Sequence, residues 1–235
     1  MHKIEIDPAV QARGRALRGR DHVFAQLDLT RTAHVVVDLQ VAFMAEGAPV
    51  EVPVAREIVP NVNAISAAVR AAGGMCVFLR YTYNPAEPLK WSAWYDAMVS
   101  PAERDKISLS FAPGNPNFEL WPDLNVQPED LVVDKTRFSA FIPGTCDLHG
   151  LLTARGIDTL IITGTLTNCC CESTARDAQQ MNYKIIFVAD GNAAITDAEH
   201  NATLCSMVAI FADVMTSDEL LAAIAASCPA LQAVA

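Results

Sequence analysis

Short, continuously hydrophobic segments alternate with longer segments of helical periodicity along this chain. The short segments are rich in Val, Ile, Leu and Phe, and they lack the strict apolar–polar alternation of a half-exposed strand. A strand that is apolar throughout is typical of a parallel sheet covered on both faces. Six strands are therefore predicted, at residues 33–38, 75–81, 130–135, 158–164, 184–190 and 212–216.

The segments between these strands predict helices. In residues 55–72 the apolar side chains recur at helical spacing, and Gly73-Gly74 ends that helix. Further helices are predicted at 146–155, 170–182, 197–211 and 217–226, and capping-box spacing marks the start of the last two. This alternation predicts an α/β fold, a three-layer α/β/α domain with a mostly parallel six-stranded sheet and right-handed crossovers.

Two segments depart from this alternation. Residues 1–30 are predicted to form an N-terminal arm, and residues 31–235 a single domain. We interpret the basic cluster of the arm (Arg13, Arg15, Arg18 and Arg20) as solvated or interface-forming. An insertion at about 82–129 is too long for an ordinary connection, so we expect it to act as a lid or an interface. Its aromatic residues include Trp91, Trp94, Tyr95, Phe111, Phe118 and Trp121.

Charge and composition narrow the possible partners. The formal net charge is −10 and the pI is about 4.9. A field of this sign repels phosphate backbones and anionic lipids, so neither nucleic acid nor membrane is expected as a partner. The start of the chain has no apolar core of a secretory signal, and no segment approaches the ~20 apolar residues that span a bilayer. A cytoplasmic location is expected, and seven cysteines do not suggest a disulfide framework.

Three residues with reactive side chains follow predicted strands. Asp38 closes the first strand, Lys135 closes the third, and Cys170 follows the fourth after a short loop. Since ligands bind at the carboxyl ends of parallel strands, all three would project into one crevice. Each also has an ordinary structural alternative. An Asp there is commonly a helix cap, a Lys is commonly solvated, and a Cys in apolar surroundings is commonly inert.

The chemistries of these three residues fit together. Cys170 would open a helix, whose N-terminus favours a thiolate, and Lys135 would add a positive charge beside it. We therefore expect Cys170 to react with alkylating agents well below the usual thiol pKa of ~8.5. Asp38 would accept the thiol proton and later pass it to a leaving group. Unpaired N–H groups at the turn before Cys170 would form an oxyanion hole.

Other kinds of site find no support in the sequence. Three consecutive cysteines, Cys169 to Cys171, cannot readily turn every sulfur onto one zinc ion, and no CxxC or HxxxH spacing accompanies them. His34, His149 and His200 are scattered, so neither a metal nor another cofactor is expected. A G-x-S-x-G elbow and a Gly-rich phosphate loop are both absent from the sequence.

Four segments together resemble the isochorismatase-like hydrolases. VVVDLQVAF (35–43) resembles their opening D-x-Q strand, and VDKTRFSAF (133–141) resembles the segment that supplies their catalytic lysine. GTLTNCCCESTARDA (164–178) resembles their G-x-x-T-N-x-C-x-E-S-T-x-R-D-A signature, with Cys170 at the nucleophile position. DGNAAIT (190–196) resembles the segment after the fifth strand. The resemblance runs from about residue 32 to 224.

The resemblance implies a cysteine hydrolase in which Asp38 is the acid/base, Lys135 its charged partner and Cys170 the nucleophile. It also implies a cis peptide at Thr165-Leu166 and an oxyanion hole formed by the backbone N–H groups of Leu166 and Cys170. Metal-free amidohydrolases, such as those acting on ureidoacrylate and N-carbamoylsarcosine, are the most similar members. A homodimer or homotetramer is expected from the same resemblance.

The substrate is less well defined by the sequence. The expected substrate is a small linear amide, ureide or carbamoyl compound, cleaved at a C–N bond through a thioester. Four aromatic residues follow strand ends or lie in the insertion and would bind it, unless they serve packing or an interface: Phe43, Tyr81, Tyr83 and Trp91. Arg80 or Arg137 would anchor a substrate carboxylate. Hydrolysis of a vinyl ether and a non-catalytic scaffold remain the alternative functions.

Overall fold

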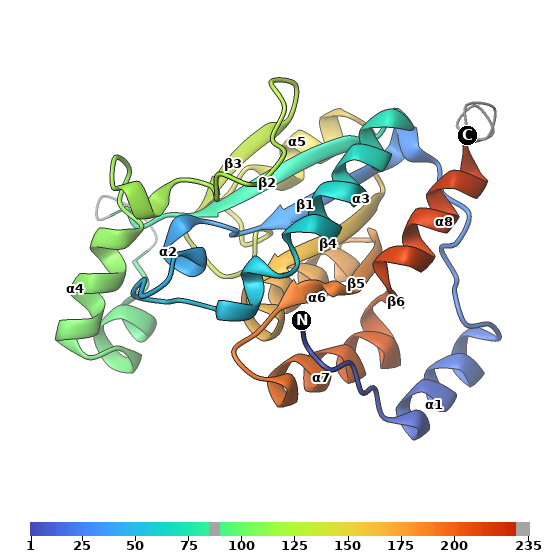
Figure 1. Ribbon diagram of the computed structural model, residues 1–235, viewed down its shortest axis with the longest axis horizontal. Helices are drawn as coiled ribbons and strands as arrows, with labels where there is room; N and C mark the ends of the chain where they lie inside the picture. The colour runs from blue at the N-terminus through green and yellow to red at the C-terminus, as the bar shows by residue number, and fades with distance from the viewer. Residues whose placement is uncertain (85–89, 229–235) are drawn as a thin grey trace.

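The computed structural model describes residues 1–84 and 90–228, and its centre is one parallel sheet of six strands (Figure 1). The spatial order of the strands is β3-β2-β1-β4-β5-β6. Their bounds are Thr32–Val37 (β1), Met75–Tyr81 (β2), Leu131–Lys135 (β3), Thr159–Thr165 (β4), Lys184–Ala193 (β5) and Asp213–Met215 (β6). All five pairings are parallel, which confirms the predicted fold class.

Side chains of the central strands alternate between two hydrophobic cores. Val36, Phe78 and Ile161 belong to the core on one face of the sheet. Val35, Val77 and Leu160, their neighbours in sequence, belong to the core on the other face. Because both faces are covered, every residue of β1 and β4 is buried, and this explains why neither strand alternates between an apolar and an exposed polar face.

Helices form the two outer layers. On one face lie α3 (Val59–Ala71) and α8 (Ser217–Ser227), which contribute Val62, Ile65 and Leu220 to the core. On the other face lie α5 (Leu148–Ala154), α6 (Glu172–Gln180) and α7 (Asp197–Ser206). The predicted capping boxes are present at the starts of α7 and α8. No helix among the described residues is both long enough and apolar enough to cross a membrane.

The first thirty residues contain a helix, α1 (Pro8–Arg18), that the sequence analysis did not predict. The Asp7 side chain accepts a hydrogen bond from the Ala9 amide at 2.7 Å, and Pro8 occupies the first helical position. The Arg18 guanidinium donates to the carbonyl oxygens of Val208 and Ala212, beside the π-helical turn η6 (Met207–Phe211). This part of the arm is therefore packed against the domain, and Arg18 is not a solvated charge.

The insertion contains short helices and lies at the carboxyl end of the sheet. These are η3 (Ala93–Met98), α4 (Pro101–Ser110) and η4 (Pro116–Phe118). In Figure 1, α4 lies beyond the short helix α2 (Val41–Met44), which directly follows β1. Two further 3-10 turns lie outside the insertion, η1 (Leu29–Arg31) and η2 (Pro53–Arg56).

Candidate active site

The predicted reactive residues surround the point where the strand order reverses. Strands β2 and β3 lie on one side of β1 in the sheet, whereas β4, β5 and β6 lie on its other side. Asp38 directly follows β1, and Cys170 lies in the π-helical turn η5 (Thr167–Cys171), which directly follows β4. A crevice forms at such a switch point in open α/β sheets, so the topology alone directs these two residues toward one place.

Lys135 reaches the same place from the end of β3. Its Nζ donates to Asp38 Oδ2 at 2.6 Å and to the Arg137 carbonyl at 3.1 Å, and it lies 5.2 Å from the centre of the Tyr81 ring. The side chains of Lys135 and Asp38 are both 0 % exposed. The structure therefore brings together two residues that are 97 positions apart in a fully buried ion pair.

The environment of this pair changes both pKa values. Burial raises the pKa of Asp38 above its ordinary value, although the Lys135 ammonium and the Cys170 thiol act in the opposite direction. Burial alone would lower the pKa of Lys135, but the Asp38 carboxylate and the Cys170 sulfur more than offset this and raise it. Lys135 consequently remains a cation near neutral pH.

Asp38 is held by its backbone as well as by Lys135. Its φ angle is 51°, an uncommon conformation for a residue other than glycine, and its amide donates to the Leu79 carbonyl at 3.1 Å. Gln40 fixes the following residues to the end of β2, because its side chain accepts from the Tyr81 amide at 2.7 Å and donates to the Tyr81 carbonyl at 3.0 Å. Asp38 Oδ1 has no hydrogen-bond partner among the described residues.

Cys170 is almost completely buried, at 3 % exposed. Its hydrogen bond to Cys169 and its burial raise the pKa of the Cys170 thiol well above the ordinary value, while Lys135 acts in the opposite direction. The expectation of a lowered pKa at Cys170 was therefore wrong, because the helix-end argument did not include burial or the neighbouring sulfur. The same hydrogen bond lowers the pKa of Cys169, which is only partly buried.

The turn that carries Cys170 has the backbone geometry expected from the resemblance. The peptide bond between Thr165 and Leu166 is cis. The Leu166 carbonyl accepts from the amides of Cys169 and Cys171, at 3.1 and 3.2 Å, on either side of the Cys170 amide. Just before this turn, Gly164 pairs in register with Val37 and has a φ of 124°. A Cβ at Gly164 would lie 2.1 Å from the Val37 carbonyl oxygen.

A cavity of about 360 Å³ lies at the ends of β2 and β3, where Thr136 and Arg137, the residues directly after Lys135, contribute to its wall. Tyr83 and Trp91, both predicted to bind substrate, line this cavity. Its other lining residues are Thr82, Asn84, Lys90, Ser92, Tyr95, Asp96, Thr136 and Arg137. A larger cavity of about 550 Å³ lies between the arm and β6. None of the three reactive residues lines either cavity.

The other two predicted aromatic residues are buried. Tyr81 lies between the cavity and the ion pair, and its hydroxyl is 2.5 Å from the hydroxyl of Tyr95. Phe43 packs against Phe111, with ring centroids 5.1 Å apart, in the hydrophobic core. Arg80 is engaged by Asp134, 2.8 Å away, whereas Arg137 lies 5.0 Å from the Trp91 ring at the cavity wall.

Several residues of this region were not identified from the sequence. Tyr95 joins the insertion to Tyr81, and Cys146 is close enough to Lys135 and Asp38 for both to affect its pKa. Neither has a local sequence signal, because their positions depend on packing between distant segments. Among the described residues, no group of three or more His, Cys, Asp or Glu side chains is arranged to hold a metal ion.

Comparison with known proteins identifies the class. Residues 32–219 match the isochorismatase domain, so this chain belongs to the isochorismatase family of hydrolases. The chain is 32% identical to the ureidoacrylate amidohydrolase RutB of Variovorax paradoxus over 216 residues, covering 83% of this chain and 82% of that protein.

Solved structures show the same relationship. The crystal structure of a cysteine hydrolase from Pseudomonas syringae pv. phaseolicola 1448A has a TM-score of 0.77 and 30% identity, covering 86% of this chain and 96% of that one. N-carbamoylsarcosine amidase from Thermoplasma acidophilum has a TM-score of 0.64 and 26% identity, covering 80% of this chain and 97% of that one. The family predicted from the sequence motifs is confirmed.

Proposed function

We propose that this protein is a cysteine-dependent amidohydrolase that cleaves a C–N bond of a small amide, ureide or carbamoyl compound. The observation that carries the proposal is the buried Asp38–Lys135 ion pair, with its contact of 2.6 Å, beside the equally buried thiol of Cys170. Relatives named ureidoacrylate amidohydrolase and N-carbamoylsarcosine amidase support C–N bond hydrolysis as the reaction class.

The proposed reaction begins with a proton transfer inside this cluster. Because the pKa of Cys170 is raised, the resting sulfur carries its proton, and the unpartnered Oδ1 of Asp38 accepts it as the sulfur attacks the substrate carbonyl carbon. Lys135 stabilises the carboxylate from its opposite oxygen, Oδ2. Backbone N–H groups of Leu166 and Cys170 hold the oxyanion that forms on the carbonyl oxygen.

Collapse of the tetrahedral intermediate breaks the C–N bond. Asp38 returns the proton to the departing nitrogen, so ammonia or an amine leaves and the acyl group remains on Cys170 as a thioester. Asp38 then takes a proton from water, and the resulting hydroxide attacks the thioester carbonyl. The C–S bond breaks, the carboxylic acid is released, and the sulfur of Cys170 recovers its proton.

The cavity at the ends of β2 and β3 supports a small, planar substrate. Trp91 and Tyr83 provide aromatic surfaces, and Arg137 provides a cation against the Trp91 ring. At about 360 Å³ the cavity is near the lower limit of small-molecule sites, which favours a compound of a few heavy atoms over a peptide.

Ammonia release from a panel of small amides, ureides and carbamoyl compounds tests the proposal. Cys170→Ala is expected to abolish turnover of every compound that the wild type hydrolyses. Cys171→Ala is the matched control, because it removes an equally buried sulfur from the adjacent residue and is expected to retain most of the activity. Full turnover by Cys170→Ala would show that the thiol is not the nucleophile.

A further inference from the structure

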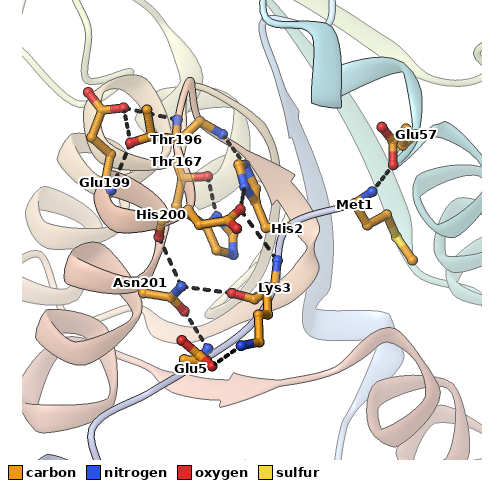
Figure 2. Close-up of polar contacts among 12 residues, drawn as sticks. Met1, His2, Lys3, Glu5, Glu57, Thr167, Thr196, Glu199, His200 and Asn201 are labelled. Carbon is orange, nitrogen blue, oxygen red and sulfur yellow. Dashed lines mark hydrogen bonds and ion pairs between the residues drawn. The ribbon is translucent and has the colours of Figure 1, made fainter.

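The side chain of His2 lies against the start of α7 (Figure 2). Its side chain is 3 % exposed. The Ala194 amide donates to His2 Nε2 at 2.9 Å, and His2 Nδ1 lies 2.7 Å from Asp197 Oδ1. Since Nε2 accepts a hydrogen bond, the ring proton is on Nδ1 and points to the carboxylate. Both ring nitrogens of His2 therefore have a hydrogen-bond partner, and the face of the ring is available for further contacts.

That face covers a second imidazole. The rings of His2 and His200 stack with centroids 4.3 Å apart and planes 20° from parallel. His200 is fully buried, and burial lowers its pKa to about 4, so the ring is neutral near neutral pH. His200 Nδ1 lies 2.9 Å from the hydroxyl of Thr167. Two contacts in series thus connect His2 of the N-terminal segment to Thr167.

Thr167 begins the η5 turn that carries Cys170. It is fully buried and lies three positions before Cys170, directly after the cis peptide and Leu166. The direction of its side chain helps to determine how the turn is seated against α7, and therefore where the Cys170 sulfur lies relative to Asp38. If His2 were removed, one face of the His200 ring would lose its cover and the ring would be free to shift.

We propose that His2 is a positioning residue for the turn that carries Cys170, acting through its stack on His200 and the His200–Thr167 hydrogen bond. This inference rests on the proposed function, because it assigns a catalytic consequence to the position of Cys170. His2 itself touches neither Asp38 nor Lys135 in the described contacts, so its effect would appear in the rate of turnover more than in the affinity for substrate.

The chain supplies a matched control for this role. The residues after His2 are held by Asn201, which accepts from the Glu5 amide at 2.7 Å and donates to the Lys3 carbonyl at 2.8 Å (Figure 2). These contacts hold the same segment, but they are separate from the stack and from Thr167. Asn201→Ala therefore weakens the docking of the segment without removing the contacts of the His2 ring.

The first measurement is steady-state ammonia release by the protein, with any tag placed at the C-terminus, away from His2. His2→Ala is expected to lower kcat by about tenfold and to leave KM within about twofold, because misplacing a reacting group costs rate before it costs binding. His2→Gln, whose amide can both accept from Ala194 and donate to Asp197 but which has no ring to stack on His200, is expected to lower kcat nearly as much as His2→Ala. Asn201→Ala is expected to stay within about twofold of the wild type.

The second measurement does not depend on substrate. Hydrogen exchange followed by mass spectrometry reports the opening of the peptide that spans residues 166–171. Exchange there is expected to be about tenfold faster in His2→Ala, and unchanged in Asn201→Ala. Unchanged exchange in His2→Ala would overturn the proposal even in an active amidohydrolase, as would an equal loss of kcat in both variants. If the wild type hydrolysed no amide, the proposed function itself would fail, and the catalytic role of His2 with it.

Discussion

The buried ion pair makes a quantitative prediction for Lys135→Met, which removes the charge and keeps much of the side-chain volume. In the wild type the two charges are 2.6 Å apart and 0 % exposed, so their attraction is on the order of 6 kcal/mol at an effective dielectric constant of about 20. Part of that attraction offsets the cost of burying both groups. Removing one partner leaves the other charge buried alone, and the expected destabilisation is about 3–5 kcal/mol.

The destabilisation caused by Lys135→Met should depend on pH, and the direction of this dependence follows from the pKa of the Asp38 carboxyl group. Without Lys135 nothing as strong opposes the burial effect, so the folded-state pKa of Asp38 rises further above its unfolded value of about 3.9. Between these two pKa values the folded protein binds more protons than the unfolded chain, so stability falls as the pH rises through that window. The destabilisation should therefore be smaller at about pH 5 than at about pH 8.

Urea-induced unfolding at the two pH values measures both effects. Lys106→Met is the matched control, because Lys106 Nζ lies 2.7 Å from Glu103 Oε1 while the two side chains are 60 % and 51 % exposed. An exposed pair of this kind contributes about 0–1 kcal/mol, so the control should change little. If Lys135→Met were no more destabilising than Lys106→Met at about pH 8, Asp38 and Lys135 would not form a buried ion pair in solution.

Three further outcomes are expected. Cys170 should react with iodoacetamide only as the pH rises above about 8.5, because its hydrogen bond to Cys169 and its burial raise its pKa. Peptide mass spectrometry follows the reaction, and a midpoint of alkylation below about pH 8.5 would contradict the raised pKa. Trp91→Ala should raise KM by about tenfold and change kcat by less than about threefold, because it removes a wall of the cavity and touches none of the three reactive side chains. A fall in kcat without a change in KM, measured by steady-state kinetics, would contradict this expectation. Thr196→Ala should lower the free energy of unfolding by about 1 kcal/mol through loss of the α7 cap, and an unchanged urea midpoint would show that the capping box adds nothing.

The hydrophobic pattern predicted the sheet well because the central strands β1 and β4 are buried on both faces, but it failed where polar residues continue a strand. Strand β5 was expected to end at Asp190 and extends to Ala193. Asn192 remains in the sheet because its side chain donates to the carbonyls of Ile162 and Val188, at 3.0 and 2.6 Å, next to an irregularity in the β4 pairing. Ile162 lies on another strand, and Val188 lies four residues before Asn192 in β5, so the local sequence pattern does not indicate these contacts.

The reactive residues were predictable for a related reason. Asp38, Lys135 and Cys170 each follow a strand that is easy to recognise, and the topology of a parallel sheet brings strand ends together. The pKa direction of Cys170 was not predictable, because it depends on how deeply the η5 turn is buried and on which neighbouring sulfur it meets. His2 and Tyr95 were missed because their roles depend on contacts between segments far apart in the chain.

Gly164 has a consequence for how this enzyme can be altered. Because even one added carbon would collide with the Val37 carbonyl, the ends of β1 and β4 approach as closely as two backbones can. The separation of these two strand ends, after which Asp38 and the η5 turn follow, is thus determined by the main chain, and repacking side chains in the sheet would leave it as it is. Substitutions that test substrate preference therefore belong at Tyr83 and Trp91 in the cavity wall, which take no part in this strand pairing.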